Sequence, residues 1–274
     1  MTKPTPISLP FINLVYGVPD LQVPDRQTLT ERIQHVEPDL PISDIRISWQ
    51  QVDAQRCLGV ITFGLHQIQI AGLSNPLPLE IINQTVQPSH WQPQIKAAIR
   101  QHQSHISLIY TGKSLDPAEK MTALYQAAHA FENENLLGVV NESAWTAHPR
   151  ADFLSPEKIQ QYQQEIPFIL WVGYVKFFID RDHFWLVTKG HHIFDVPDFA
   201  YFIQPGESTD NVTALFINVF YYLYEGDAVV TAGDTLSIGE TGEHMRFSEV
   251  TEYPEILLGP SGTLVIEKIS PEEA

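Results

Sequence analysis

Hydrophobic and polar positions follow two different periods along the chain, which indicates a mixture of strands and helices. Several short runs are rich in β-branched and aromatic residues and end at glycine, proline or polar positions, as strands do. In the first half these runs cover residues 11–16, 45–49, 57–63, 65–70, 106–110 and 136–140. Apolar residues spaced three or four positions apart predict helices over 28–36, 90–102 and 116–131.

The third of these helices has the clearest start signal. Asp116, Pro117 and Glu119 combine an acidic N-cap, a proline at the first helical position and a glutamate three residues after the cap. Proline is tolerated there because the first turn of a helix makes no intrahelical use of the missing N–H. We therefore expect a helix that begins at Pro117.

The second half shows the same mixture of periods. Its most apolar stretch, Phe168–Ile179, is predicted to form a buried strand. A helix is predicted to follow Thr209 and Asp210 and to stop at Gly226. Its broad buried face is expected to contain Val212, Leu215, Phe216, Val219, Phe220 and Leu223. The remaining extended runs cover residues 184–188, 193–203, 235–238, 245–250 and 263–266.

The polar stretch Asn141–Asp152 separates the two halves, and we place the domain boundary after residue 150. The predicted units are therefore residues 1–150 and residues 151–274. Each contains extended segments before and after a helix. This order favours an α+β fold of two similar-sized halves, with mainly antiparallel sheets covered by helices.

Acidic residues dominate the second half. The 274 residues carry a formal net charge of −17, of which residues 1–150 account for −3 and residues 151–274 for −14. Nucleic acids and anionic lipid surfaces attract clustered Lys and Arg, so both are disfavoured as partners. A basic protein partner fits this charge, whereas an acidic surface that only confers solubility is the simpler reading.

The sequence contains a single cysteine, Cys57, which precludes an internal disulfide and a thiolate zinc cluster within one chain. Its apolar neighbours predict a small buried side chain rather than a reactive thiolate. No uninterrupted apolar run reaches the length of a signal peptide or a membrane span. We therefore expect a cytoplasmic protein that carries no cofactor.

Four segments of the second half form a recognisable combination: Leu170-Trp171-Val172 at the start of an aromatic strand, Leu186–Gly190, the apolar helix Val212–Tyr224 and the turn Gly233-Asp234-Thr235. In these segments the second half resembles a bacterial family known as domain of unknown function 4261. The first half resembles the region that commonly precedes this domain, through Leu73–Pro78, the helix from Trp91 and His102-Gln103-Ser104-His105. The resemblance implies a fold and a bacterial cytoplasmic setting, but no established activity.

Two histidine pairs are the main candidates for site chemistry. His102 and His105 lie at a helix end and a strand start. They would either converge on a metal or a proton-transfer task, or His102 would hydrogen-bond a helix-end carbonyl while His105 packs at the strand edge. His191 and His192, with Asp195 and Asp198 nearby, offer the donor atoms of a divalent metal site. Adjacent strand residues point to opposite faces, so both imidazoles would reach one ion only if the chain turns after Gly190.

The absence of a nucleophile elbow, a phosphate loop and a dinucleotide fingerprint favours a protein that acts by binding. We expect a non-catalytic, adaptor or immunity-like module with an acidic and aromatic surface. Its candidate binding residues are Trp171, Trp185, Glu240, Glu243, Glu249, Glu252, His102 and His105. The alternative is a metal-dependent hydrolase that uses His191, His192 and Asp195.

Overall fold

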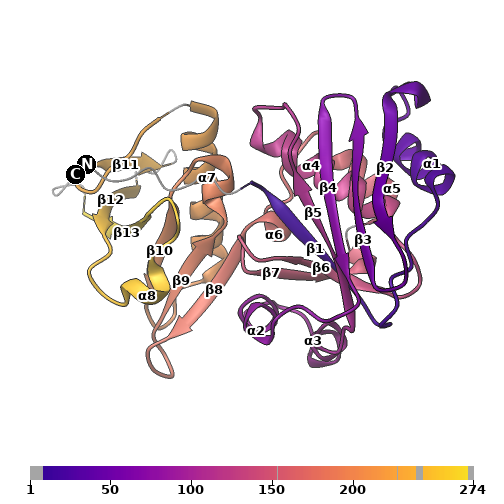
Figure 1. The fold of residues 1–274 in the computed structure, drawn as a ribbon. Coiled ribbons are helices and arrows are strands. Elements are labelled where there is room, and N and C mark those ends of the chain that lie inside the picture. Colours follow the sequence, from indigo (N-terminus) through magenta and orange to yellow (C-terminus); the bar gives the residue numbers. More distant parts are fainter. Residues whose placement is uncertain (1–8, 153, 227, 239–242, 271–274) are drawn as a thin grey trace, which may run out of the picture. The chain divides into compact units, whose positions relative to one another are not determined.

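The computed structural model describes residues 9–270 except 153, 227 and 239–242 (Figure 1). Its internal contacts divide the chain into two compact units, residues 1–171 and residues 172–274. Helices and mainly antiparallel sheets occur in both units, which confirms the α+β class. The boundary falls after Trp171 rather than after residue 150, because the Trp171 ring packs 5.9 Å from Tyr125 and 5.8 Å from Tyr162 in the first unit.

The first unit is built on a seven-stranded antiparallel sheet with the order β2-β3-β4-β5-β1-β6-β7. The strands are β1 (Phe11–Tyr16), β2 (Ile45–Val52), β3 (Arg56–Phe63), β4 (His66–Leu73), β5 (Ser104–Tyr110), β6 (Leu136–Asn141) and β7 (Thr146–Pro149). The α-helices are α1 (Arg26–Val36), α2 (Leu79–Val86), α3 (Pro93–Arg100), α4 (Pro117–Ala130), α5 (Pro156–Gln161) and α6 (Phe168–Trp171). Two 3₁₀ turns, η1 (Ile42–Asp44) and η2 (Arg150–Asp152), complete the unit.

Helices cover both faces of this sheet because strand side chains alternate between the faces. α4 packs with α1 and α5 and contacts β1, β4 and β5, whereas α2 and α3 lie beside β6 and β7 (Figure 1). On the side of α2 and α3, Val15 and Val140 pack with Ile82. Tyr16 points the other way and donates a hydrogen bond to the Phe131 carbonyl at the end of α4 (3.3 Å).

The predicted start of α4 is confirmed. The helix begins at Pro117, and the Asp116 carboxylate accepts a hydrogen bond from the Ala118 amide (2.9 Å). The polar stretch taken as the boundary between the halves contains β7, which pairs with β6 and closes the first sheet. The pattern missed this strand because it has four residues, too few for an alternation to stand out.

The second unit contains a six-stranded sheet with the order β11-β12-β13-β10-β9-β8, in which the β10–β13 pair is parallel and the others are antiparallel. The strands are β8 (Gly173–Phe178), β9 (Phe184–Lys189), β10 (Asp198–Ile203), β11 (Thr235–Ile238), β12 (Glu243–Glu249) and β13 (Thr263–Ile269). The helices are η3 (His191–Phe194), α7 (Thr209–Gly226) and α8 (Pro254–Leu257).

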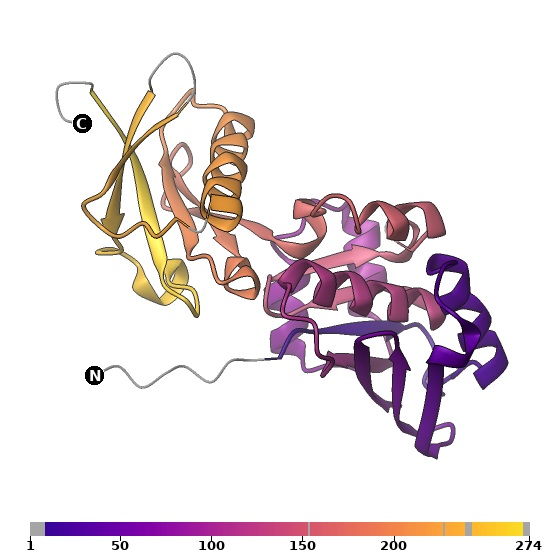
Figure 2. The ribbon, with the colours of Figure 1, turned by 90° about the horizontal axis from the view of Figure 1, so that it is seen from above.

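Helix α7 runs along one face of this sheet (Figure 2). All six apolar residues that define its predicted face are buried: Val212, Leu215, Phe216, Val219, Phe220 and Leu223. Phe216 meets Phe199 of β10 with ring centroids 5.8 Å apart. The amphipathic pattern therefore predicted both this helix and the surface that it buries.

The prediction of one continuous strand over Phe168–Ile179 is wrong in its first part. Residues Phe168–Trp171 form α6, and β8 begins only at Gly173. The amides of Leu170 and Trp171 donate to the Pro167 carbonyl at 2.8 and 3.2 Å, so the proline opens a helical turn. Trp171 is fully buried in the first unit and is not part of an exposed aromatic strand.

Candidate functional site

A pocket of about 530 Å³ lies in the second unit. We call it the second-unit pocket, and its lining residues are Trp185, Phe202, Ser248, Glu249, Thr251, Glu252, Leu257, Val265 and Glu267. Three of the predicted binding residues, Trp185, Glu249 and Glu252, therefore meet in one pocket. Sequence positions more than sixty residues apart are brought together by the order of the strands.

Strand register explains why these side chains share a face. Trp185 of β9 stands opposite Phe202 of β10, and Ser248 of β12 stands opposite Val265 of β13. Ala200, two residues from Phe202, pairs with Val265 across the parallel junction, so all four strands contribute to one surface. This surface is the one opposite α7, because α7 packs on Phe199, whose side chain points away from that of Ala200.

The aromatic floor of the pocket is well packed. Trp185 is 9% exposed, and its ring lies 5.1 Å from that of Phe202. Phe202 is in turn stacked on His183 at 5.9 Å, and His183 is held by the Asp180 carboxylate at 3.0 Å. The buried Nε1–H of Trp185 has no hydrogen-bond partner among the residues that the structure describes. A buried indole N–H of this kind usually has a hydrogen-bond acceptor.

The rim of the pocket is acidic. Glu249 ends β12, Glu252 follows in the connection to α8, and both are exposed, while the lining contains neither Lys nor Arg. Glu267 also lines the pocket, where it accepts a hydrogen bond from Ser248 (3.2 Å). Arg246 stands opposite Glu267 across β12 and β13. Glu249, Glu252 and Glu267 are therefore the acidic residues of the pocket lining.

Beneath α8 lies a buried polar cluster centred on Asp198, which is 1% exposed. Its Oδ1 accepts hydrogen bonds from the His191 amide (3.2 Å) and the Thr188 hydroxyl (3.3 Å). Its Oδ2 has no hydrogen-bond partner among the described residues and lies against Gly259, where an added Cβ would be 2.0 Å away. Burial raises the pKa of Asp198 to about 7, although the charge of Lys189 acts to lower it.

Lys189 anchors α8 to the sheet. Its Nζ donates hydrogen bonds to the carbonyls of Leu257 and Leu258, both at 3.1 Å, where the last turn of α8 leaves carbonyls without intrahelical partners. Burial lowers the pKa of Lys189, while Asp198 acts to raise it. Because Leu257 lines the second-unit pocket, this buried cluster fixes one wall of the pocket.

The structure does not bring together the three residues of the predicted metal site. His191 is fully buried, donates from Nδ1 to the Pro197 carbonyl (3.0 Å) and packs 5.0 Å from Phe220. His192 is half-buried and Asp195 is exposed. Across the described ranges, no group of three or more His, Cys, Asp or Glu side chains is placed so that it could hold a metal ion.

His102 and His105 are both buried in the first unit and serve backbone groups. His102 accepts at Nε2 from the Leu77 amide (2.8 Å), and its Nδ1 donates to the Ile99 carbonyl at the end of α3 (2.9 Å). His105 donates from Nδ1 to the Asn75 carbonyl (2.8 Å). Burial lowers the pKa of both imidazoles. They hold the loop before α2 and offer no binding surface.

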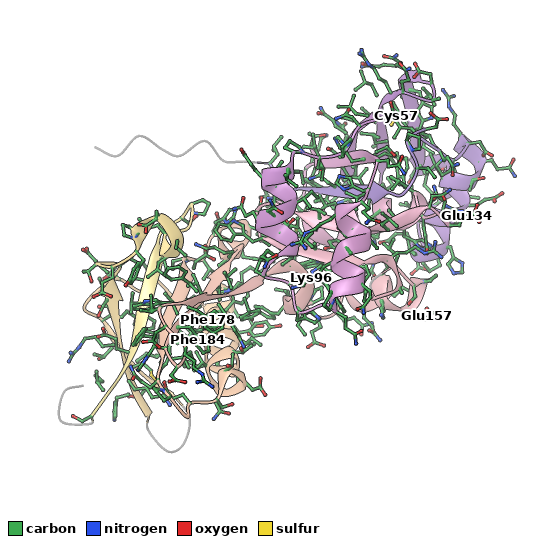
Figure 3. All side chains as sticks on the ribbon, turned by 90° about the horizontal axis from the view of Figure 1, so that it is seen from below. Cys57, Lys96, Glu134, Glu157, Phe178 and Phe184 are labelled. Atoms are coloured by element: carbon green, nitrogen blue, oxygen red, sulfur yellow. The ribbon has the colours of Figure 1, made fainter. Side chains whose placement is uncertain are left out.

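The other predicted binding residues differ in outcome. Trp171 is buried in the first unit, as described above. Glu240 lies outside the described residues, and of Glu243 only the backbone, at the start of β12, is described. The exposed aromatic of the β8–β9 hairpin is Phe178, which is 59% exposed and packs 5.1 Å from Phe184 (Figure 3).

Sequence reasoning did not single out Phe202, Val265 or Glu267 as site residues. Their strands were predicted, but the pocket depends on β13 lying between β10 and β12, which no local pattern specifies. The alternation of Ala200 and Phe202 with their neighbours was the available signal, since it marks one face of the strand. The interruption at Pro197 obscured it.

Residues 187–267 match a family model described as Domain of unknown function (DUF4261). The match runs from β9 to β13 and confirms the resemblance stated for the second half of the chain, while the similarity of the preceding region remains a prediction. No curated protein and no solved structure shows significant similarity to the chain. The helices in the described part of the chain are all too short or too polar to cross a membrane.

Proposed function

We propose that the second unit, which carries the DUF4261 match, is a non-catalytic protein-binding module that captures a basic segment of a partner. The observation that carries this proposal is the meeting of Trp185 and Phe202 with Glu249 and Glu252 in a single pocket of about 530 Å³. An adaptor or immunity-like role would follow, in which the bound partner surface is occluded.

The pocket matches the two ends of a Lys or Arg side chain. The apolar stem of such a residue would lie on the rings of Trp185 and Phe202, and its charged head would reach Glu249 and Glu252. The Nε1–H of Trp185 has no partner among the described residues and would be the donor for a backbone carbonyl of the same segment. Aromatic anchors with a polar rim are typical of the residues that carry most of the energy at protein interfaces.

The charge of the whole unit supports a basic partner. Residues 172–274 contain 17 acidic and 5 basic side chains, a net charge of −12. Such a surface accelerates the encounter with a cation and disfavours acidic partners. Because the rim carboxylates are exposed, their contribution is screened over about 8 Å at physiological ionic strength.

Titration of the full-length protein with a fluorescein-labelled arginine–glycine repeat peptide, followed by fluorescence anisotropy, tests this proposal. We expect binding that weakens as sodium chloride is raised. The double variant Glu249→Gln/Glu252→Gln should bind about tenfold more weakly, since two surface charges of about 0.7 kcal/mol each are lost. Trp185→Phe should also weaken binding, because it keeps an aromatic ring in the floor but removes the N–H donor and part of the ring surface.

The matched control is Asp182→Asn/Glu225→Gln, which removes the same charge from two exposed positions of the second unit outside the pocket. This control should change the affinity by less than about twofold. Equal losses in the two double variants would show that the peptide responds to net charge alone. That result, or binding that high salt leaves unchanged, contradicts the proposed site.

A further inference from the structure

A second pocket, of about 380 Å³, lies entirely within the first unit, and we call it the first-unit pocket. It is formed by the chain after α1, the turn between β3 and β4 with the strand residues beside it, the part of α4 up to Gln126, and the two residues after α5. The lining residues are Glu37, Leu40, Phe63, Gly64, Leu65, His66, Asp116, Ala118, Glu119, Thr122, Gln126, Tyr162 and Gln163. Its volume lies within the range of small-molecule sites.

The charged groups of this lining are all carboxylates. Glu37, Asp116 and Glu119 contribute them, and the lining contains neither Lys nor Arg. His66 lies among them, with its Nδ1 at 3.2 Å from the Tyr110 hydroxyl. Burial lowers the pKa of His66, although the charge of Glu119 acts to raise it, so the imidazole adds little positive charge at neutral pH. The pocket therefore favours a cation.

The side chain of Gln126 indicates which chemical group a ligand would offer. Gln126 is 1% exposed, and its Nε2 donates a hydrogen bond to Glu37 Oε1. A carboxylate only accepts, so this contact fixes which end of the amide is the oxygen. Gln163 donates to the same Glu37 oxygen and confirms its role as an acceptor. The buried Oε1 of Gln126 is left without a hydrogen-bond partner in the part of the chain that the structure describes.

An unpaired buried carbonyl oxygen and three carboxylates in one pocket lining favour a ligand rich in N–H donors. We infer that the first-unit pocket binds a small organic cation with ammonium or guanidinium groups, one of which donates to Gln126 Oε1. The rings of Phe63 and Tyr162 offer an apolar and π-rich surface for its carbon skeleton. A metal ion fits less well, because the carboxylates of the described residues form no group that could hold one.

Isothermal titration of the full-length protein in phosphate buffer with spermidine, agmatine and choline tests this inference. Spermidine and agmatine present N–H donors, whereas choline has the charge without any N–H. We expect one of the first two to bind in a one-to-one complex, and choline to bind at least tenfold more weakly. Absence of binding by both donors at millimolar concentration, or equal binding of choline, would overturn the inference.

Variants locate the site. Gln126→Met should abolish donor binding while the melting temperature of the ligand-free protein changes little, because methionine fills the same space without an unpaired oxygen. Glu119→Gln, at an exposed position, should weaken binding severalfold and keeps the test decisive if the first variant fails to fold. Glu80→Gln, exposed on α2 and outside the pocket, is the control and should leave affinity unchanged.

The inference is independent of the proposed function, since the two pockets lie in different units. Spermidine binding should survive Glu249→Gln/Glu252→Gln in the second unit and be lost in Gln126→Met. Loss of spermidine binding in Glu249→Gln/Glu252→Gln but not in Gln126→Met would show that the amine binds in the second unit. That result would refute the first-unit site and leave the peptide-binding proposal unaffected.

Discussion

Replacing Asp198 by asparagine tests whether this buried carboxyl makes the stability of the second unit depend on pH. The folded state raises its pKa to about 7 from the ordinary 3.8. Between these values the folded unit holds a proton that the unfolded chain has released, so this group's contribution to stability falls as pH rises from about 4 through about 7. This difference in pKa between the folded and unfolded states corresponds to about 4 kcal/mol of unfolding free energy over the full pH range.

The variant Asp198→Asn keeps the acceptor for the His191 amide and the Thr188 hydroxyl but cannot ionise. We therefore expect it to match the parent near pH 4 and to exceed the parent near pH 8 by up to about 4 kcal/mol. His191 acts in the opposite sense, since burial lowers its pKa to about 3 and its contribution to stability rises with pH up to about 6.5. Both proteins contain His191, so its contribution cancels when the free energy of unfolding of the parent is compared with that of the variant.

Hydrogen exchange with mass spectrometry is the suitable assay, because peptides from residues 184–203 report on the second unit alone. The free energy of opening should be compared between parent and variant from about pH 5 to about pH 8, after correction for intrinsic exchange rates. Asp182→Asn, at an exposed position in the β8–β9 hairpin, is the control and should track the parent. A parent-minus-variant difference that stays constant over this range would refute the reasoning.

Three further predictions concern single contacts. His102→Leu leaves the buried Leu77 amide without its acceptor, so urea unfolding should show a loss of about 1–3 kcal/mol, and an unchanged midpoint would contradict the hydrogen bond. Gly259→Ala places a Cβ 2.0 Å from Asp198 Oδ2 and should lower the free energy of unfolding by about 1–3 kcal/mol. An unaltered melting temperature would show that the neighbouring atoms move aside at no cost in stability. Cys57 is fully buried, and burial raises its pKa to about 11, so Ellman's reagent near pH 8 should label it only in denaturant, which rapid native labelling would disprove.

Local pattern predicted most elements but few of the contacts that form the site. The apolar face of α7 and the N-cap at Asp116 were read correctly because both depend on neighbours within a few residues. Trp171 was misplaced because an apolar run looks the same in a buried strand and a buried helical turn. The burial of the candidate His102 depends on an amide twenty-five residues away, which no periodicity reveals.

The two pockets both favour a cation, but they differ in the neutral group that stays unpaired. The second-unit pocket has a buried donor, the Nε1–H of Trp185, whereas the first-unit pocket has a buried acceptor, Gln126 Oε1. A basic peptide supplies both a cation and a carbonyl, while spermidine supplies donors only. Spermidine therefore leaves the indole unpaired, and we expect it to displace the labelled peptide no better than sodium chloride of equal ionic strength. Competition well above that level, measured by anisotropy, would show that the Trp185 donor does not select the ligand of the second unit.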